Sequence, residues 1–210
     1  MTGVQTCALP ISAIETMTHL PVSTYAALSA FYLIVLFVIE IVWEDYSMDQ
    51  VAYTYLISII LSLAWQGVMR IYGAGFAGFG MLYVAIACYA CDTGAYFFGV
   101  FLGKHKMNPK ISPNKTWEGA IGGYLCGLGF SILVAIYLCP TMPKTLMYTA
   151  SYLLPAMAEI GDLAFSSIKR RFNLKDFGNL LPEHGGVLDR IDSLAFCLML
   201  FNGLMVLWGL

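Results

Sequence analysis

The chain has 210 residues, of which 59% are hydrophobic and only 11% are charged. Together with a mean hydropathy of +0.74, this composition excludes an ordinary soluble domain and indicates a protein with several membrane-spanning segments. The formal net charge of −2 gives the chain no general basic character, and we expect membrane lipids around it and no nucleic-acid partner.

The first eleven residues read MTGVQTCALPI. They resemble the in-frame translation of a short sequencing adapter, and we therefore expect residues 1–11 to be an artefact that encodes no biology. On this interpretation one integral-membrane domain occupies residues 12–210, and the helices that precede it in the natural protein are missing.

Six apolar stretches are each long enough to cross the hydrocarbon core as a helix, which takes about 20 residues. They lie near Tyr25–Trp43, Val51–Met69, Phe79–Leu102, Ala120–Leu138, Leu146–Phe165 and Ser193–Leu210. The connections between them show no internal repeat and no room for a second module. The sequence therefore predicts an all-α fold, a polytopic transmembrane bundle of about six membrane-spanning helices.

Nine of the eleven lysines and arginines fall in two connections, at 103–117 and 168–191. They are Lys104, Lys106, Lys110 and Lys115 in the first, and Lys169, Arg170, Arg171, Lys175 and Arg190 in the second. Because cytoplasmic loops carry an excess of Lys and Arg, we expect both connections on the cytoplasmic side. Two basic loops separated by one pair of helices can converge on one pocket that faces the cytoplasm.

Four ionisable residues lie inside the apolar spans, where they are costly and suggest a functional role. They are Glu40, Asp92, Glu159 and Asp162. Asp162 is the strongest candidate because it begins a helical stripe that continues through Ser166, Lys169 and Arg170 toward the membrane edge. The alternative is an ion pair that only holds the helix end. Glu159 could be a protonated packing partner or a hydrogen-bond acceptor, and Asp92 a support or a direct participant.

Residues 166–192 gather five basic and four acidic side chains in one short polar stretch. His184 and the pair Gly185–Gly186 predict a tight turn, after which Asp189 and Asp192 share one face at the start of the last helix. Glycine amides and a helix N-terminus can cradle phosphate, and aspartates can hold a hard divalent cation. The alternative is that the acidic residues only cap the helix. A metal beside a basic cluster is typical of phosphoryl chemistry.

These residues are also those of a family signature. SSIKRRFNLKDFGNLLPEHGGVLDRID resembles the hallmark motif of the phosphatidate cytidylyltransferase (CDP-diacylglycerol synthase) family. The matching positions are Ser166, Lys169, Arg170, Lys175, Asp176, Gly178, Pro182, His184, Gly185, Gly186, Asp189, Arg190 and Asp192. Upstream, CDTGAYFFGVFLGKHKMNPKISPNKTWEGAIGG is similar to a second signature block of the same family, so the resemblance covers roughly residues 75–210.

The resemblance implies transfer of the cytidylyl group from CTP to phosphatidate, which gives CDP-diacylglycerol and pyrophosphate. It also implies Mg²⁺, with K⁺ as a candidate second ion, and Asp162 and Asp189 as metal ligands. The implied catalytic residues are Asp162, Lys169, Lys175, Asp176, Asp189 and Asp192. The implied substrate-binding residues are Ser112, Lys115, Thr116, Ser166, Arg170, His184, Gly185, Gly186 and Arg190.

Several interpretations stay open at this point. The segment 112–118 could be only a helix cap with Trp117 at the membrane interface, and His184 could fix a turn rather than transfer a proton. The acceptor could be an isoprenoid-type lipid phosphate, and a transporter is a more distant alternative. The resemblance further implies a homodimer in a bacterial inner membrane, with its active site facing the cytoplasm.

Overall fold

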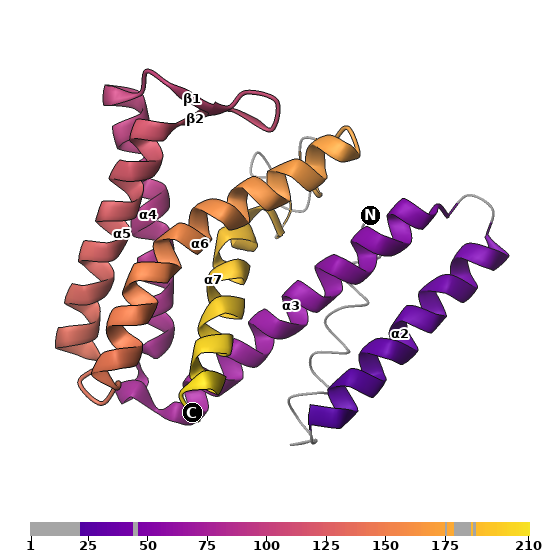
Figure 1. The fold of residues 1–210 in the computed structure, drawn as a ribbon, viewed down its shortest axis with the longest axis horizontal. Coiled ribbons are helices and arrows are strands. Elements are labelled where there is room, and N and C mark those ends of the chain that lie inside the picture. Colours follow the sequence, from indigo (N-terminus) through magenta and orange to yellow (C-terminus); the bar gives the residue numbers. More distant parts are fainter. Residues whose placement is uncertain (1–21, 44–45, 175, 179–185, 187) are drawn as a thin grey trace.

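The computed structural model describes residues 22–43, 46–174, 176–178, 186 and 188–210. The helices among them are α2 (Val22–Val42), α3 (Met48–Ala74), α4 (Gly80–Leu102), α5 (Trp117–Leu138), α6 (Lys144–Arg171) and α7 (Leu188–Leu207), with a short 3₁₀ turn, η1 (Phe76–Gly78). Each corresponds to one of the six predicted spans, so the prediction of an all-α membrane bundle is confirmed (Figure 1).

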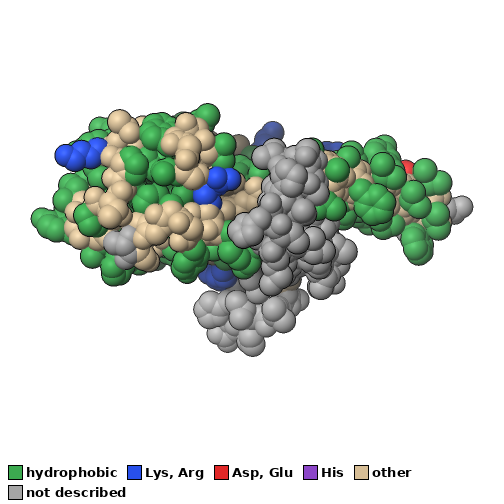
Figure 2. All heavy atoms as spheres, turned by 90° about the horizontal axis from the view of Figure 1, so that it is seen from below, with side chains coloured by type: hydrophobic (Ala, Val, Ile, Leu, Met, Phe, Trp, Pro, Cys, Tyr) green, Lys and Arg blue, Asp and Glu red, His purple; other side chains and the backbone are tan. Residues whose placement is uncertain are grey.

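Four of these helices are long and apolar enough to cross a membrane: α3, α4, α5 and α7. In α2 the apolar stretch Ala26–Val42 is shorter, and α6 ends in Lys169, Arg170 and Arg171. Large hydrophobic side chains are exposed along the helices, and they cover much of the face in Figure 2. Exposed apolar surface on this scale is expected where lipid is the solvent, so the chain is an integral membrane protein.

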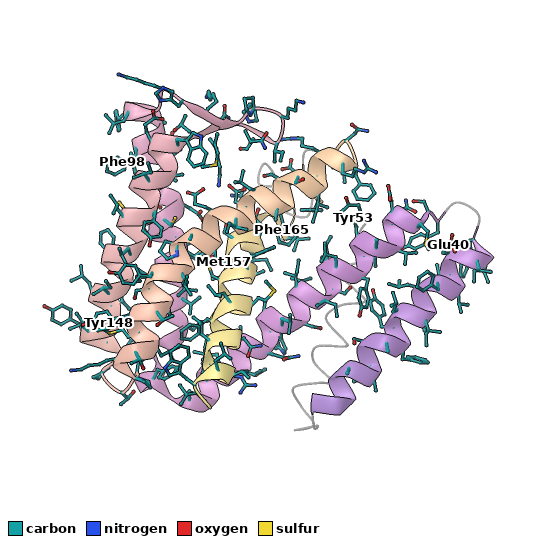
Figure 3. The ribbon with its side chains drawn as sticks, in the orientation of Figure 1. Glu40, Tyr53, Phe98, Tyr148, Met157 and Phe165 are labelled. Carbon is teal, nitrogen blue, oxygen red and sulfur yellow. The ribbon has the colours of Figure 1, made fainter. Side chains whose placement is uncertain are left out.

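The core lies where α3, α4, α6 and α7 meet. Tyr83, Phe165 and Phe201 are its largest fully buried side chains, and Phe165 lies on the part of α6 that crosses α7 (Figures 1 and 3). Pro155 lies inside α6, where it lacks the amide that a regular helix would donate. The helix bends midway in Figure 1, and its second half, which includes Glu159 and Asp162, extends toward the connection between α4 and α5 at residues 103–116.

Helices α4 and α5 pack against each other more extensively than any other pair. Three glycines four residues apart on α5 face three carbonyl oxygens of α4. A Cβ atom would lie 2.8 Å from Ala95 O at Gly119, 2.6 Å from Cys91 O at Gly123 and 2.8 Å from Ala87 O at Gly127. Small residues at this spacing allow helix backbones to approach closely and to make Cα–H···O contacts.

A two-stranded hairpin joins α4 to α5, and the sequence did not predict it. Strand β1 (Lys106–Asn108) pairs antiparallel with β2 (Ser112–Thr116), with Lys106 opposite Thr116 and Asn108 opposite Ser112. The close approach of α4 and α5 brings the two ends of this connection together, so a hairpin can close it. In Figure 1 the hairpin extends from the α4 and α5 ends toward the second half of α6.

The glycine contact yields a prediction about stability. We expect Gly123→Ala to destabilise the bundle by about 1–3 kcal/mol, because the added methyl overpacks the α4 backbone. Gly129→Ala on the same helix is the matched control, since nothing lies within 4 Å of its added Cβ. Thermal unfolding of both variants in detergent measures the difference. Equal melting temperatures would contradict the packing role of Gly123.

Candidate active site

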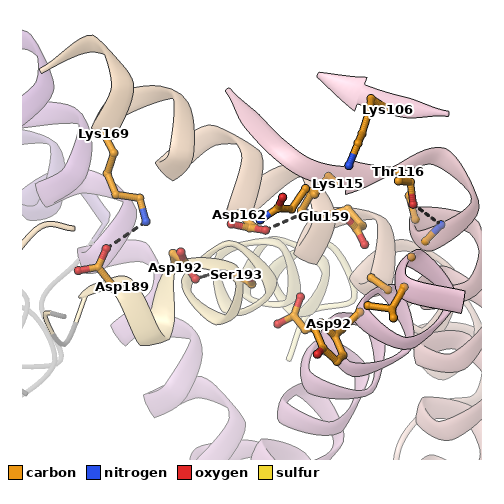
Figure 4. Close-up of a pocket in the computed structure, with 17 residues that line it drawn as sticks. Asp92, Lys106, Lys115, Thr116, Glu159, Asp162, Lys169, Asp189, Asp192 and Ser193 are labelled. Atoms are coloured by element: carbon orange, nitrogen blue, oxygen red, sulfur yellow. Dashed lines mark hydrogen bonds and ion pairs between the residues drawn. The ribbon is translucent and has the colours of Figure 1, made fainter. Parts of the chain in front are cut away.

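A cavity of about 660 Å³ lies between the hairpin and helices α4, α5, α6 and α7 (Figure 4). Five carboxylates and three lysines line it. They are Asp92, Glu159, Asp162, Asp189, Asp192, Lys106, Lys115 and Lys169. Lysines from both predicted basic loops contribute, so the expectation that the two loops converge on one pocket is confirmed.

Lys115 connects the hairpin to α6. Its Nζ lies 2.6 Å from Glu159 Oε2 and 2.8 Å from Asp162 Oδ2, and all three side chains are largely removed from solvent. Burial lowers the pKa of the Lys115 ammonium, but the charges of Asp162 and Glu159 outweigh this effect and raise the pKa above its usual value. Lys115 therefore stays charged at neutral pH and holds the hairpin to α6.

The other oxygen of Asp162 is 3.3 Å from Ser166 Oγ, which donates a hydrogen bond one helical turn away. This contact confirms that Asp162 and Ser166 share one stripe of α6. The carboxylate pairs with a lysine from the other loop rather than with Lys169 or Arg170 of the same helix. The ion pair therefore joins two elements and does not merely hold the helix end.

Asp189, in the first turn of α7, has both oxygens engaged. Lys169 Nζ lies 3.0 Å from Oδ1, while the amides of Phe177 and Gly186 donate to Oδ2 at 2.8 Å and 3.0 Å. The Lys169 ammonium also lies 5.5 Å from the centre of the Phe177 ring, a cation–π contact. Asp189 thus ties Phe177 and Gly186 to the first turn of α7, and the Gly186 amide, predicted to cradle phosphate, here donates to this carboxylate.

The base of the hairpin is fixed by Glu118. Its Oε1 lies 2.5 Å from His105 Nδ1, and its Oε2 accepts hydrogen bonds from the amides of Lys104 and His105 at 3.1 Å and 3.2 Å. Thr116 is the N-cap of α5, accepting from Gly119 N at 3.2 Å. The segment 112–118 therefore does provide a helix cap, and its residues Lys115 and Thr116 also line the cavity.

The predicted site residues divide into three groups. Those that line the cavity are Lys115, Thr116, Asp162, Lys169, Asp189 and Asp192. Those that are described but do not line it are Ser112, Ser166, Arg170, Asp176, Gly186 and Arg190. Lys175, His184 and Gly185 lie outside the described residues.

Arg170 donates to the carbonyls of Ile111 and Leu174 at 3.3 Å and 3.2 Å, so it braces the hairpin from α6.

Three charged residues of the cavity were not among the predicted site residues. For Asp92 and Glu159, costly charges inside apolar spans, the sequence leaves two roles open each, and it identifies Lys106 only as a charge of the first basic loop. The sequence signal that could have identified Asp92 and Glu159 as site residues is their position well inside the apolar spans. Strand pairing turns Lys106 toward the cavity, and no periodicity indicated that pairing. Glu40, the remaining ionisable residue inside the apolar spans, lies on α2 away from the site (Figure 3).

Carboxylate oxygens suit a hard divalent cation, but the described residues hold no group of three His, Cys, Asp or Glu side chains placed to bind one together. Asp162 and Asp189, the predicted ligands, line one cavity and pair with different lysines. Mg²⁺ in phosphoryl-transfer sites is commonly bound by one or two carboxylates together with substrate phosphates. The donor set fits that arrangement, in which bound substrate supplies the other oxygens.

The ion pairs of Lys115 yield a second prediction. We expect Lys115→Met to destabilise the fold by about 1–3 kcal/mol, between the values for exposed and fully buried pairs, because Glu159 and Asp162 lose their counter-charge. Amide hydrogen exchange should rise across the hairpin, 106–116. Lys110→Met, in the hairpin turn, is the control. Unchanged exchange in Lys115→Met would show that the ammonium does not hold the hairpin.

Comparison with known proteins shows what this chain is similar to. Residues 2–208 match the profile of the Cytidylyltransferase family. A phosphatidate cytidylyltransferase of Staphylococcus haemolyticus is 40% identical over 150 residues, which are 70% of this chain and 58% of the relative. The enzyme of that name from Staphylococcus aureus (strain COL) is 43% identical over 126 residues, which are 60% of this chain and 48% of the relative. The chain thus spans about half the length of these curated relatives, and it belongs to the cytidylyltransferase family.

Proposed function

We propose that this chain carries the site that transfers a cytidylyl group from CTP to phosphatidate, giving CDP-diacylglycerol and pyrophosphate. The observation that carries the proposal is that lysines of the hairpin and of α6 meet carboxylates of α4, α6 and α7 in one cavity. The names of the Staphylococcus relatives support the choice of phosphatidate as acceptor.

The reaction needs two anions to be held together. An oxygen of the phosphatidate phosphate attacks the α-phosphorus of CTP, a new phosphoanhydride bond forms, the bond to the β-phosphate breaks, and pyrophosphate leaves. A phosphate monoester is largely ionised at neutral pH, so the attacking oxygen needs positioning and charge neutralisation more than a general base. Lysines lining a cavity at the end of a helix bundle are suited to both tasks.

Charge balance supports a divalent cation in this site. Five carboxylates against three lysines leave the cavity lining with an excess of negative charge when every group is ionised. A triphosphate would be repelled by that excess, so we propose that Mg²⁺ is held by Asp162, with Asp189 as the second candidate ligand and with phosphate oxygens of the bound substrate. Bound there with the nucleotide, Mg²⁺ would neutralise phosphate charge. K⁺ is a further proposal, which the family resemblance supports.

We propose that the protein lies in a bacterial inner membrane with the cavity facing the cytoplasm. The clustering of basic residues in the hairpin and at the end of α6 supports this orientation. A homodimer is also proposed, on the family resemblance. Cross-linking of the protein in native membranes, with size measurement in detergent, tests the dimer.

The reaction itself is tested by incorporation of labelled CTP into lipid, with phosphatidate supplied and Mg²⁺ present or chelated. The assay compares the 210-residue chain with a chimera that adds the segments of the Staphylococcus haemolyticus relative lying outside the matched region, which is 58% of that protein. Product in either protein supports the proposal. An isoprenoid-type lipid phosphate serves as second acceptor, and labelling of that lipid alone would overturn phosphatidate as the substrate.

Asp162 gives the sharpest variant. We expect Asp162→Asn to lower Mg²⁺-dependent turnover about a hundredfold or more, as for the loss of one charge that stabilises a transition state. The required Mg²⁺ concentration should also rise. Asp49→Asn is the control, because Asp49 forms an exposed ion pair with Arg171. Normal turnover and Mg²⁺ dependence in Asp162→Asn would exclude this carboxylate from the site.

A further inference from the structure

Lys106 differs from the other two lysines of the cavity in its partners. Lys115 pairs with Glu159 and Asp162, and Lys169 pairs with Asp189. Lys106 forms no ion pair and no side-chain hydrogen bond with any residue that the structure describes. In Figure 4 its ammonium extends from β1 toward the cavity, near Lys115.

The backbone at Lys106 is fixed by its partner in the neighbouring strand and by contacts of the residue that precedes it. Lys106 lies opposite Thr116 in the strand pair, and the amide of Trp117 donates to His105 O at 3.0 Å. Glu118 binds the His105 ring and amide, so the residue before Lys106 is tied to the first turn of α5. These contacts limit where the ammonium can reach, although the side chain forms no ion pair or hydrogen bond with a described residue.

We propose that Lys106 is a substrate-binding residue that contacts a phosphate group in this cavity, an inference that rests on the proposed function. A phosphate that recruited Lys115 or Lys169 would have to compete with ion pairs already made, and would leave partly buried carboxylates unpaired. Lys106 incurs no such loss. Its ammonium can form a charge-assisted hydrogen bond to a phosphate oxygen directly.

A neighbouring positive charge does not oppose this role. Lys115 lies on β2 of the same hairpin, but its charge is balanced by two carboxylates within 2.8 Å. Lys115 therefore does not repel the Lys106 ammonium. The phosphate it contacts could belong to the triphosphate of CTP or to phosphatidate, since both present the same oxygen ligands.

The test separates these two sources. Binding of CTP is measured by calorimetry in detergent. Binding of phosphatidate is measured as a shift in the electrophoretic mobility of the protein in nanodiscs that contain phosphatidate, compared with nanodiscs of phosphatidylcholine alone. The variants are Lys106→Met, Lys106→Arg and, as control, Lys110→Met, which lies in the hairpin turn and does not line the cavity. Melting temperature is recorded for each, and the KM for each substrate is measured in the labelled-CTP assay.

We expect Lys106→Met to weaken the affinity for one of the two substrates about ten- to hundredfold, the usual effect of a hydrogen bond to a charged group. Lys106→Arg should recover most of it, Lys110→Met should match the wild type, and melting temperatures should not change. A weaker affinity for CTP assigns the triphosphate, and one for phosphatidate assigns the lipid.

Three outcomes would overturn the assignment: unchanged affinity for both substrates in Lys106→Met, a lowered melting temperature that explains the loss, or the same loss in Lys110→Met. Failure of the proposed function looks different. Intact wild-type binding without turnover would overturn the reaction but leave Lys106 assigned, whereas a wild type that binds neither substrate overturns both.

Discussion

The close contact between α4 and α5 is the constraint on which the site depends. Gly119, Gly123 and Gly127 allow the α5 backbone to lie against carbonyl oxygens of α4, and no larger residue could do so without moving a helix. The contact sets how far apart the two helices are where the hairpin begins and ends. It therefore determines where β1 and β2, and the lysines they carry, lie relative to α6.

The hairpin is then fixed by charge rather than by apolar burial. Glu118 holds its base through the His105 ring and two amides, Arg170 donates to its Ile111 carbonyl, and Lys115 reaches the two carboxylates of α6. In a membrane protein, packing between apolar surfaces gives little preference for one arrangement, because lipid tails are equally apolar. Directed polar contacts are what can place a short loop over a defined cavity.

Sequence reasoning predicted the parts of this structure that follow from composition and local spacing. The six helices, the stripe from Asp162 to Ser166 and the meeting of two basic loops all rest on hydropathy, helical period or charge distribution, and all are confirmed. The apolar span of α6 was predicted to end at Phe165, and the helical stripe predicted beyond it, through Lys169 and Arg170, agrees with a helix that continues to Arg171.

The pairing of charges could not be predicted in this way. Asp162 pairs with Lys115, a residue 47 positions earlier, and Asp189 pairs with Lys169 on another helix, so each pair depends on the tertiary arrangement. Lys106 became a cavity residue only through the register that sets it opposite Thr116. The sequence shows which charged residues are present. Their partners depend on contacts between helices, and the local periodicity of the sequence does not encode those contacts.

The pattern of pairing also separates the tasks of the lysines. Lys115 and Lys169 each neutralise carboxylates that would otherwise lie unpaired near the membrane, which is costly. The first role of Lys115 and Lys169 is therefore to stabilise the fold, because removal of either lysine leaves an uncompensated carboxylate charge. Lys106 makes no such contribution, so its position in the cavity has no structural reason among the described contacts. A cation that forms no ion pair among the described residues, in a cavity whose other two lysines are already paired, is available for an anion that arrives from outside the chain.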